Sequence, residues 1–583
     1  KAGLDPRKIC GVTSLDIVRA RKFIHEATGA PMETIDVPVV GGHAGATILP
    51  LFSQVPACKG MSAAELEAMD KHVQDAGTDV VNAKGGKGSA TLSMAYAGAK
   101  FGNAVLCGLA GIETTECAYV IRGSEEQLPY LASKVTFGAG GVKEVHGFGD
   151  MSEYEQGRLK ECLEQLKGEI DAGISYASEN ELAIEKTGSA WDASCIPATP
   201  SAPPQPNLAA SDKKTGNFKV CVCGGAGGIG QPLCLLMAQN PHVSELCVFD
   251  LTLAMVPAEG VAADLSHLET KVKVKGYALD KDDKPVEKLG ECLTGCDLVL
   301  VPAGMPRKPG MTRADLLGVN AGIAKNIVEA CAKYCPNAIL GLIVNPVNSV
   351  VPAMCELYKK AGLDPRKICG VTSLDIVRAN KFVHEATGAA IETIDVPVVG
   401  GHAGTTILPL FSQVPACKGL TPEQLTAMDK HVQDAGTDVV NAKGGKGSAT
   451  LSMAYAGAKF GNAVLCGLAG IETTECAYVT RGAQEELPYM ASKVTFGIGG
   501  VKDVHGFGPL SDYEKERMAE CLKQLKDEID AGLSYAAQNE LSIEKATNPW
   551  DASSIPAKPS APPQPKLAPS SKKTGNFKVC VCG

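Results

Sequence analysis

Residues 218–230 read Phe-Lys-Val-Cys-Val-Cys-Gly-Gly-Ala-Gly-Gly-Ile-Gly, so a short hydrophobic run leads directly into a glycine-rich turn. The run is typical of a strand buried on both faces, and an apolar helical pattern follows the turn. Glycines keep such a turn tight and let the backbone approach a pyrophosphate, which the free N–H groups of the following helix can bind. The stretch therefore predicts a phosphate-binding turn built on Gly224, Gly227, Gly228 and Gly230.

Asp250 closes the next predicted strand, 20 residues after Gly230. A carboxylate at this position can accept hydrogen bonds from the ribose hydroxyls of a bound adenosine, and it would repel the extra phosphate of NADP. The predicted cofactor is therefore NAD. The alternative is a tight turn in which Asp250 only caps its strand.

Outward from this turn, hydrophobic runs alternate with helical patterns. Strands are predicted at 218–222, 245–249, 296–302 and 338–344, with helices near 228–239, 314–334 and 349–361. This alternation predicts an α/β fold with a doubly wound parallel (Rossmann) sheet. Beyond about residue 363 a mixed α+β substrate domain is predicted to pack on the first, with strands at 391–399, 464–480 and 492–498, helices near 422–441 and 448–460, and a long terminal helix from residue 512.

The chain is a tandem repeat: residues 1–224 return as residues 360–583 at a constant offset of 359, with about 40 substitutions and no gap. Solenoid repeats run to roughly 20–50 residues, so each copy is expected to be a whole globular protein. Two segments rich in Pro, Ser, Ala and Lys are predicted linkers. The predicted organisation is a partial copy at 1–195, a linker at 196–216, an NAD-binding Rossmann domain at 217–362, a substrate and catalytic domain at 363–555, a linker at 556–575 and the first strand of a further copy at 576–583.

Composition narrows the classes of function. A net charge of -9 without a basic run argues against a surface that binds nucleic acid. The sequence contains no stretch of about 20 apolar residues, so a membrane-spanning helix is not expected. The 22 cysteines show no disulfide spacing, and Cys221 and Cys223 lack further ligands nearby, so reduced thiols and no metal site are expected. We expect an intracellular protein, cytoplasmic or in the mitochondrial matrix. Because no initiator Met is present, we also expect a segment of a longer tandem product.

Two polar features follow predicted strands of the first domain. Arg307 and Arg313 lie on one loop punctuated by Gly and Pro, and they can offer two guanidinium forks to carboxylate or carbonyl oxygens. Either arginine alone would be read as part of a solvated loop. Asn345 precedes Pro346 at a strand end, where it is either a turn residue or a contact for a substrate hydroxyl or a nicotinamide.

Two more polar features lie in the second domain. Asp375 and Arg378 share one helix face, and the simplest alternative is a surface ion pair worth at most about 0.5 kcal/mol. Glycines on both sides leave the imidazole of His402 accessible, and a buried Asp beside it would complete a proton-transfer dyad. A single His is more often structural, but the four features together supply the groups needed to remove a hydride from a secondary alcohol.

Five motifs resemble the NAD-dependent malate dehydrogenases of the mitochondrial and bacterial type. They are Gly-Gly-Ile-Gly-Gln-Pro-Leu (227–233), Asp-Leu-Ser-His (264–267), Arg-Lys-Pro-Gly-Met (307–311), Asn-Pro-Val-Asn (345–348) and Gly-Gly-His-Ala-Gly (400–404). The resemblance covers essentially all of 217–555, and 1–195 resembles the back half of the same family. It implies an oxidoreductase that interconverts (S)-malate and oxaloacetate. It also implies a homodimer, and pairing of neighbouring tandem units is one way to form it.

The resemblance also implies residue roles. His402 would be the general acid/base, oriented by Asp375, while Arg378 would bind the C1 carboxylate and Arg313 would polarise the carbonyl. Arg307 would bind the second carboxylate of the dicarboxylate substrate. The remaining implied contacts are Asn345 to substrate and cofactor, Asn320 to the cofactor and Met453 to the nicotinamide pocket.

The leading partial copy keeps Asp16, Arg19, His43 and Met94 but has no glycine turn, arginine loop or Asn-Pro of its own. Alone it is expected to be inactive. Pairing with residues 217–359 as a permuted enzyme is the alternative, although chain continuity across 359–360 favours the continuous pairing.

Two further alternatives stay open for the complete copy. Lys446 departs from the family pattern and either adds a cation near the nicotinamide or faces solvent. A non-catalytic tandem scaffold, or a dehydrogenase of another 2-hydroxy acid, are the rival functions, and Arg307 disfavours the second.

Overall fold

The computed structural model describes residues 4–122, 128–182, 216–305, 313–481, 487–545, 550–551, 561 and 575–582. The chain divides into two compact units, one drawn from residues 1–213, 267–271 and 572–583 and the other from residues 214–266 and 272–571. Each unit has buried hydrophobic clusters of its own.

The second unit begins with six parallel strands in the spatial order β8-β7-β6-β9-β10-β11. This is the order of the Rossmann fold, so the predicted fold class is confirmed. The strands are β6 (Phe218–Cys223), β7 (Val243–Leu251), β8 (Lys273–Leu279), β9 (Leu298–Val301), β10 (Ile339–Leu342) and β11 (Ile368–Gly370). The connecting helices are α5 (Gly230–Ala238), α6 (Ala258–Ser266), α7 (Pro285–Leu293), α8 (Arg313–Tyr334) and α9 (Val347–Lys360).

The mixed α+β region continues the same sheet. Strand β14 (Thr473–Thr480) joins β11 in antiparallel fashion, with Gly370 opposite Tyr478. Beyond β14 come β15 (Tyr489–Gly497), β12 (Val398–Gly400) and β13 (Ile407–Pro409), while β16 (Gly500–Val504) pairs with β15. The Rossmann strands and the strands of the second region therefore share one ladder through β11.

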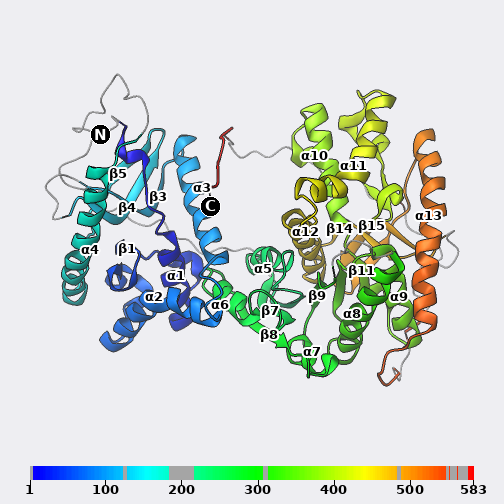
Figure 1. The fold of residues 1–583 in the computed structure, drawn as a ribbon, viewed down its shortest axis with the longest axis horizontal. Helices are drawn as coiled ribbons and strands as arrows, with labels where there is room; N and C mark the ends of the chain where they lie inside the picture. Colours follow the sequence, from blue (N-terminus) through cyan, green and yellow to red (C-terminus); the bar gives the residue numbers. More distant parts are fainter. Residues whose placement is uncertain are drawn as a thin grey trace. The chain divides into compact units, whose positions relative to one another are not determined.

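Four helices accompany these later strands: α10 (Ser373–Thr387), α11 (Pro422–Ala442), α12 (Leu451–Leu468) and α13 (Asp512–Ala537). The sequence explains why α13 begins where it does. Ser511 accepts a hydrogen bond from the Glu514 N–H, and the Glu514 carboxylate accepts one from the Ser511 N–H, which is a capping box. Buried residues at helical spacing, such as Cys521, Leu525 and Ile529, form the stripe on one face of α13. Figure 1 shows α13 running beside α9.

Two predicted strands are wrong over part of their length. Residues 391–393 form a 3-10 turn, and only Val398–Gly400 pairs as a strand. Pro397 has no N–H to donate to a ladder, so pairing begins after it. Residues 464–468 belong to α12 rather than to a strand, because a fully buried apolar run reads the same in a helix and in a central strand.

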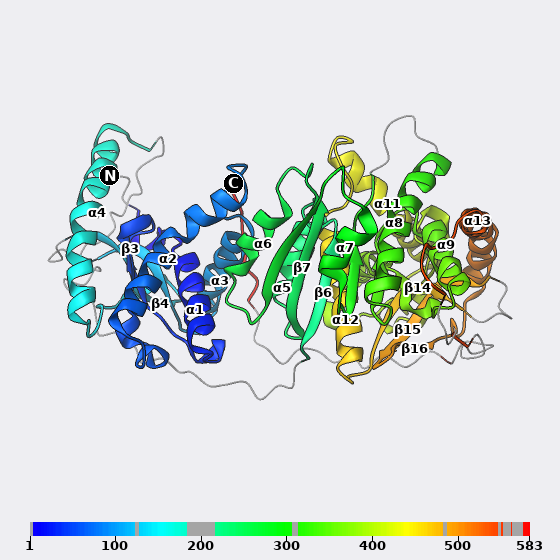
Figure 2. The ribbon, with the colours of Figure 1, turned by 90° about the horizontal axis from the view of Figure 1, so that it is seen from below.

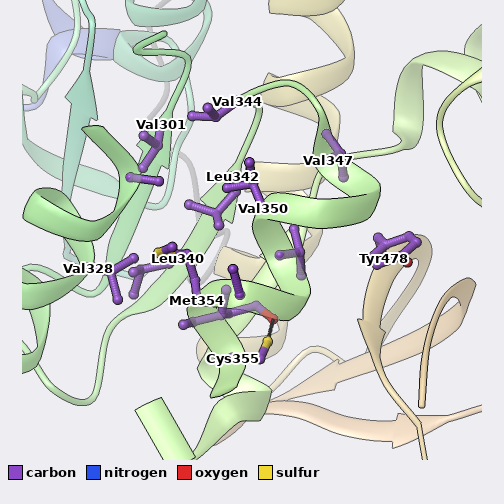
Figure 3. Close-up of a cluster of buried hydrophobic side chains, with 14 of the residues drawn as sticks. Val301, Val328, Leu340, Leu342, Val344, Val347, Val350, Met354, Cys355 and Tyr478 are labelled. Atoms are coloured by element: carbon purple, nitrogen blue, oxygen red, sulfur yellow. Dashed lines mark hydrogen bonds between the residues drawn. The ribbon is translucent and has the colours of Figure 1, made fainter. Parts of the chain in front are cut away.

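A buried cluster joins the ends of β9 and β10 to the first turns of α9 (Figure 3). Val301, Leu342, Val344, Val347 and Val350 are all almost completely buried. Burying one such side chain contributes about 1.5–3 kcal/mol relative to leaving it exposed. The cluster therefore holds two strand ends and the start of a helix in fixed positions beneath the candidate site.

The first unit repeats the later part of the second. Its elements are α1 (Ser14–Thr28), β1 (Val39–Gly41), β2 (Ile48–Pro50), α2 (Ala63–Ala83), α3 (Leu92–Leu109), β3 (Thr114–Ile121), β4 (Tyr130–Gly138), β5 (Gly141–Val145) and α4 (Glu153–Glu179). The sheet order is β2-β1-β4-β3, with β5 paired to β4. Helix α4 lies on one side of this sheet and α1 to α3 on the other (Figures 1 and 2). Gly11 bridges to Tyr119 just as Gly370 bridges to Tyr478, at the point where the longer sheet continues into β10.

Two expectations from composition concern membrane-spanning helices and the state of the cysteines. Among the described helices, none combines the length and the hydrophobicity that crossing a bilayer requires. The described cysteines are free thiols, and most of them are buried.

Candidate active site

The glycine turn lies at the carboxyl end of β6, as predicted. Gly224 has a φ of 96°, a left-handed conformation that favours glycine, and a Cβ there would lie 2.7 Å from the backbone nitrogen of Ala303. Its N–H donates to the Phe249 carbonyl at 2.8 Å. Gly227 and Gly228 are exposed at the N-terminal end of α5. The backbone is therefore open to an anion at the point where the helix dipole favours one.

Asp250 lies beside this turn at the end of β7. Its Oδ2 accepts a hydrogen bond from the Ala226 N–H at 2.9 Å. Burial raises the pKa of the Asp250 carboxyl, and the backbone N–H groups of Leu251 and Ala226 oppose the rise. The structure thus brings the predicted carboxylate and the glycine turn together, with one carboxylate oxygen already engaged by the turn.

Asn320 connects the ends of two strands. Its Oδ1 accepts from the Met305 N–H at 2.7 Å, and its Nδ2 donates to the Asn345 carbonyl at 2.7 Å and to the Met305 carbonyl at 3.2 Å. These bonds all go to the backbone, so the cofactor contact assigned to Asn320 stays a prediction. The Asn345 side chain is exposed at the carboxyl end of β10.

The second region supplies a His–Asp–Arg cluster. His402 Nδ1 lies 2.6 Å from Asp375 Oδ2, and Arg378 Nη1 lies 3.8 Å from Asp375 Oδ1. The Asp375 side chain is fully buried, and the His402 side chain is 13% exposed. Asp375 stands in the first turn of α10, where the helix dipole favours a carboxylate. The imidazole and carboxylate predicted to form a dyad are in contact, and the complete burial of Asp375 argues against the alternative of a surface ion pair between Asp375 and Arg378.

Burial and the neighbouring carboxylates act in opposite directions on the pKa values of His402 and Arg378. Burial lowers the pKa of His402, but the charge and hydrogen bond of Asp375 outweigh burial and hold this pKa above its ordinary value. Burial also lowers the pKa of the Arg378 guanidinium, against the opposing effect of Asp375 and Asp438. An imidazole in this state can hold a proton near neutral pH and release it to a bound reactant.

The structure describes four other predicted residues to different extents. Arg307 lies outside the described residues, and Arg313 is the first residue of α8, with a side chain that is not described. Met453 is buried in α12. Lys446 is exposed in the glycine-rich segment after α11, which favours the solvent-facing interpretation.

The first unit carries the same cluster. His43 Nδ1 lies 2.6 Å from Asp16 Oδ2, and Arg19 Nη1 lies 3.8 Å from Asp16 Oδ1. The His43 side chain is 45% exposed, and Met94 is only partly buried. The dyad geometry is therefore repeated, in a more open environment.

Sequence reasoning missed the residues that hold the loop of His402. The His402 N–H donates to Asn348 Oδ1 at 2.9 Å, and the Asn348 Nδ2 donates to Thr406 Oγ1 and to Glu528 Oε2. Asn348 ends the Asn-Pro-Val-Asn motif, which was the only available signal. Neither Thr406 nor Glu528 stands in a motif that could have identified it. Among the described residues, no group of three or more His, Cys, Asp and Glu side chains is arranged to hold a metal ion.

A Rossmann sheet with this glycine turn, carboxylate and His–Asp–Arg cluster defines the class of dinucleotide-dependent dehydrogenases. The family model described as lactate/malate dehydrogenase, NAD binding domain, matches residues 218–370. The model described as lactate/malate dehydrogenase, alpha/beta C-terminal domain, matches twice, at residues 13–177 and 372–536. The chain belongs to the lactate/malate dehydrogenase family, and the double match confirms the tandem arrangement.

Relatives that are about 50% identical to this chain match the length of one copy. The chain is 50% identical over 343 residues to the mitochondrial malate dehydrogenase of Eucalyptus gunnii, which spans 58% of this chain and 96% of that protein. It is 52% identical over 322 residues to the mitochondrial malate dehydrogenase 1 of Arabidopsis thaliana, spanning 55% of this chain and 91% of that protein. The apo malate dehydrogenase structure from Picrophilus torridus is 25% identical with a TM-score of 0.49, over 55% of this chain and 99% of that one.

Proposed function

We propose that residues 217–555 catalyse the reversible NAD-dependent oxidation of (S)-malate to oxaloacetate. The observation that carries this proposal is the buried dyad, His402 Nδ1 to Asp375 Oδ2 at 2.6 Å with Arg378 beside it, in the same unit as a Rossmann sheet. The proposal places the NAD-binding domain at 217–362, the catalytic domain at 363–555 and linkers at 196–216 and 556–575. Relatives at 50–52% identity that carry the name malate dehydrogenase support it.

The cofactor proposed is NAD, which accepts or returns the hydride when bound. The exposed glycines 227 and 228 at the start of α5 fit a pyrophosphate, and Asp250 at the end of β7 fits the ribose hydroxyls of an adenosine. A carboxylate at this position disfavours a 2′-phosphate. The role of Asp250 therefore also decides between NAD and NADP.

The proton path uses the dyad. In malate oxidation the neutral His402 takes the hydroxyl proton at Nε2, while Nδ1–H donates to Asp375 and keeps the ring in one tautomer and orientation. In oxaloacetate reduction the protonated ring returns that proton to the forming alkoxide. Arg378 is proposed to bind the C1 carboxylate, because a guanidinium can form two parallel hydrogen bonds with it.

Arg307 and Arg313 complete the proposed substrate site. Arg313 polarises the carbonyl, and Arg307 pairs with the second carboxylate of the dicarboxylate. A hydrogen bond to a charged group contributes about 1.5–3 kcal/mol, and a guanidinium facing a methyl group would stay unpaired in a closed site. Preference for malate over lactate therefore rests on Arg307, and Arg307→Gln is expected to move preference toward pyruvate. Asn345, Asn320 and Met453 are proposed to line the substrate and nicotinamide pockets.

The assembly proposed for the complete copy is a homodimer, and a dimer formed between tandem units is the alternative to one formed between separate chains. The first turns of α12 expose Leu451 (73%) and Tyr455 (56%), which a dimer contact could cover. Sedimentation of the full chain tests this. The proposed location is intracellular, and the relatives compared above carry mitochondrial names.

The decisive experiment is an NADH-absorbance assay of the full chain with oxaloacetate. Turnover that is lost in His402→Asn supports the proposal. A non-catalytic scaffold would show no turnover in the unmodified chain, and a lactate-type enzyme would prefer pyruvate.

A further inference from the structure

Asn348 is a buried side chain without a place in the proposed reaction. It stands in the first turn of α9 and is 1% exposed. Its Oδ1 accepts from the His402 N–H at 2.9 Å. Its Nδ2 donates to Thr406 Oγ1 at 3.2 Å and to Glu528 Oε2 at 2.6 Å. One amide therefore joins α9 and α13 to the two ends of the loop that carries His402.

The contact with this loop is close as well as polar. A Cβ on Gly401 would lie 2.6 Å from Asn348 Nδ2, so only a glycine lets the amide pack directly against the backbone before His402. Within the loop, Thr406 Oγ1 donates to the Ala403 carbonyl at 2.8 Å and accepts from the Ala403 N–H at 3.1 Å. The loop thus has its own turn, and Asn348 attaches that turn to the rest of the unit.

Glu528 decides which way the Asn348 amide faces. A carboxylate only accepts, so the Nδ2 group must point to Glu528 and the Oδ1 must point to the His402 N–H. The second oxygen of Glu528 accepts from Gln524 Nε2 at 3.2 Å on the same helix. The carboxylate on α13 and the backbone N–H of His402 therefore favour the same orientation of the amide.

The first unit shows that the turn within the histidine loop and the attachment of that turn by Asn348 are separate features. Its loop has the same internal bonds, with Thr47 Oγ1 donating to the Ala44 carbonyl at 2.8 Å and accepting from the Ala44 N–H at 3.1 Å. Among the described residues no side chain accepts a hydrogen bond from the His43 N–H, and Glu169, the counterpart of Glu528, is exposed. The turn therefore forms without the asparagine, and the attachment is an additional feature of the complete copy.

We propose that Asn348, oriented by Glu528, is a positioning residue that holds the His402 imidazole at the place where the substrate hydroxyl is bound. The inference rests on the proposed function. A catalytic group displaced by about 1 Å can lose about 10²-fold in rate, so a hydrogen bond to the backbone of His402 itself acts directly on turnover. Among the described residues, Asn348 makes no hydrogen bond with the glycine turn or with Asp250, so cofactor binding is expected to be independent of it.

The test uses the full chain and three variants: Asn348→Ser, Glu528→Gln and the control Asn462→Ser. Asn462 also pairs with an asparagine, Asn240, at 2.9 Å, but it is exposed and its hydrogen bond does not involve the dyad. Asn348→Ser is expected to lower kcat 10- to 100-fold with KM for NADH within two-fold of the unmodified chain. Glu528→Gln is expected to lower kcat two- to ten-fold, because a neutral amide no longer fixes the orientation. The control is expected to match the unmodified chain.

A second readout separates positioning from a general loss of structure. The His402 ring is faced by Asp375 and Arg378, so displacement of the ring from Asp375 is expected to lower the His402 pKa, measured by NMR titration of labelled histidine. Folded Asn348→Ser chain with unchanged kcat and unchanged His402 titration overturns the inference. If Asn348→Ser does not fold, an unchanged kcat and titration in Glu528→Gln overturns it instead. Absence of turnover in the unmodified chain overturns the proposed function, and the inference with it.

Discussion

Each of the two units has a His–Asp pair among its described residues, and the two pairs differ in their surroundings rather than in their geometry. The Nδ1–Oδ2 distance is 2.6 Å for His402–Asp375 and for His43–Asp16, yet the histidine side chain is 13% exposed in the first case and 45% in the second. In both copies the acid raises the histidine pKa. Local sequence thus builds the proton-transfer geometry, and the Rossmann region with α9 is what the complete copy adds around it.

Helices α12 and α3 show the same contrast in packing. In α12, a Cβ on Gly461 would lie 3.1 Å from Met237 Sδ, so the helix packs closely on α5. The counterpart Gly102 in α3 has nothing within 4 Å. Identical helix sequences therefore carry a buried face in one copy and an open face in the other.

The largest expected difference between the copies is in turnover. His402→Asn is expected to lower kcat for oxaloacetate reduction by about 10²–10⁴-fold, because general acid–base transfer contributes about that much. His43→Asn is expected to leave turnover unchanged, since no glycine turn accompanies strands β1 to β5 among the described residues of the first unit. Both are read by NADH absorbance in the full chain. Equal losses in the two variants would mean that the leading copy takes part in catalysis.

The pH dependence should distinguish the acids of the two dyads. Oxaloacetate reduction needs protonated His402, so its kcat/KM is expected to fall as pH rises through a pKa above 6.5, while malate oxidation rises over the same range. Asp375→Asn removes the group that raises this pKa, and burial then lowers it, so both profiles are expected to move to lower pH. Profiles at constant ionic strength check this. Asp16→Asn is the control and should move neither profile.

A smaller difference between the copies is expected in the stability that the packing of α12 and α3 provides. Gly461→Ile is expected to destabilise the second unit by about 1–3 kcal/mol through overpacking against Met237 and Leu298. Gly102→Ile introduces the same side chain in the same helix sequence but meets open space, so it should change the first unit far less. Hydrogen exchange of peptides from α12 and α3 measures each unit separately. A larger loss of protection in α3 would contradict the packing described for the two copies.

The smallest effect concerns the helix that has diverged between the copies. Gly157 is exposed within α4, has nothing within 4 Å and stands where α13 has Glu516. Gly157→Ala is expected to stabilise the first unit by about 0.5–1 kcal/mol, because glycine is a poor helix former. Slower hydrogen exchange of the α4 amides, with the α13 amides unchanged, would support this prediction. Unchanged exchange of the α4 amides would mean that the stability of α4 depends on its packed face and not on the helix propensity of residue 157.

Much of the fold and site was accessible from the sequence because the signals are local. The glycine turn, Asp250 and the Asp375–Arg378 spacing each lie within one strand, turn or helix. The alternation of hydrophobic runs with helical patterns predicted a parallel sheet, although not the order of its strands. Local signals failed where a largely apolar segment lacks the periodic spacing that distinguishes a helix from a strand. Residues 464–468 are such a segment, and they are helical. They also failed at residue 391, where the chain turns before the short strand β12 begins.

The attachment of the His402 loop could not be predicted in the same way. Asn348 reaches partners 54 and 180 residues away along the chain, and no spacing in the sequence announces such contacts. The motif that contains Asn348 pointed to its neighbour Asn345 instead. A tertiary hydrogen-bond network of this kind becomes visible only when three elements are placed together.

The shared strand β11 has a mechanical consequence. It pairs with β10 over residues 368–370 and with β14 at Gly370, so backbone hydrogen bonds run without interruption from the Rossmann strands to the strands beside the dyad. Rotating one half against the other would break that ladder. We therefore expect ligand entry and release to proceed by movement of surface segments and side chains, with the distance between the glycine turn and His402 kept nearly constant throughout the cycle.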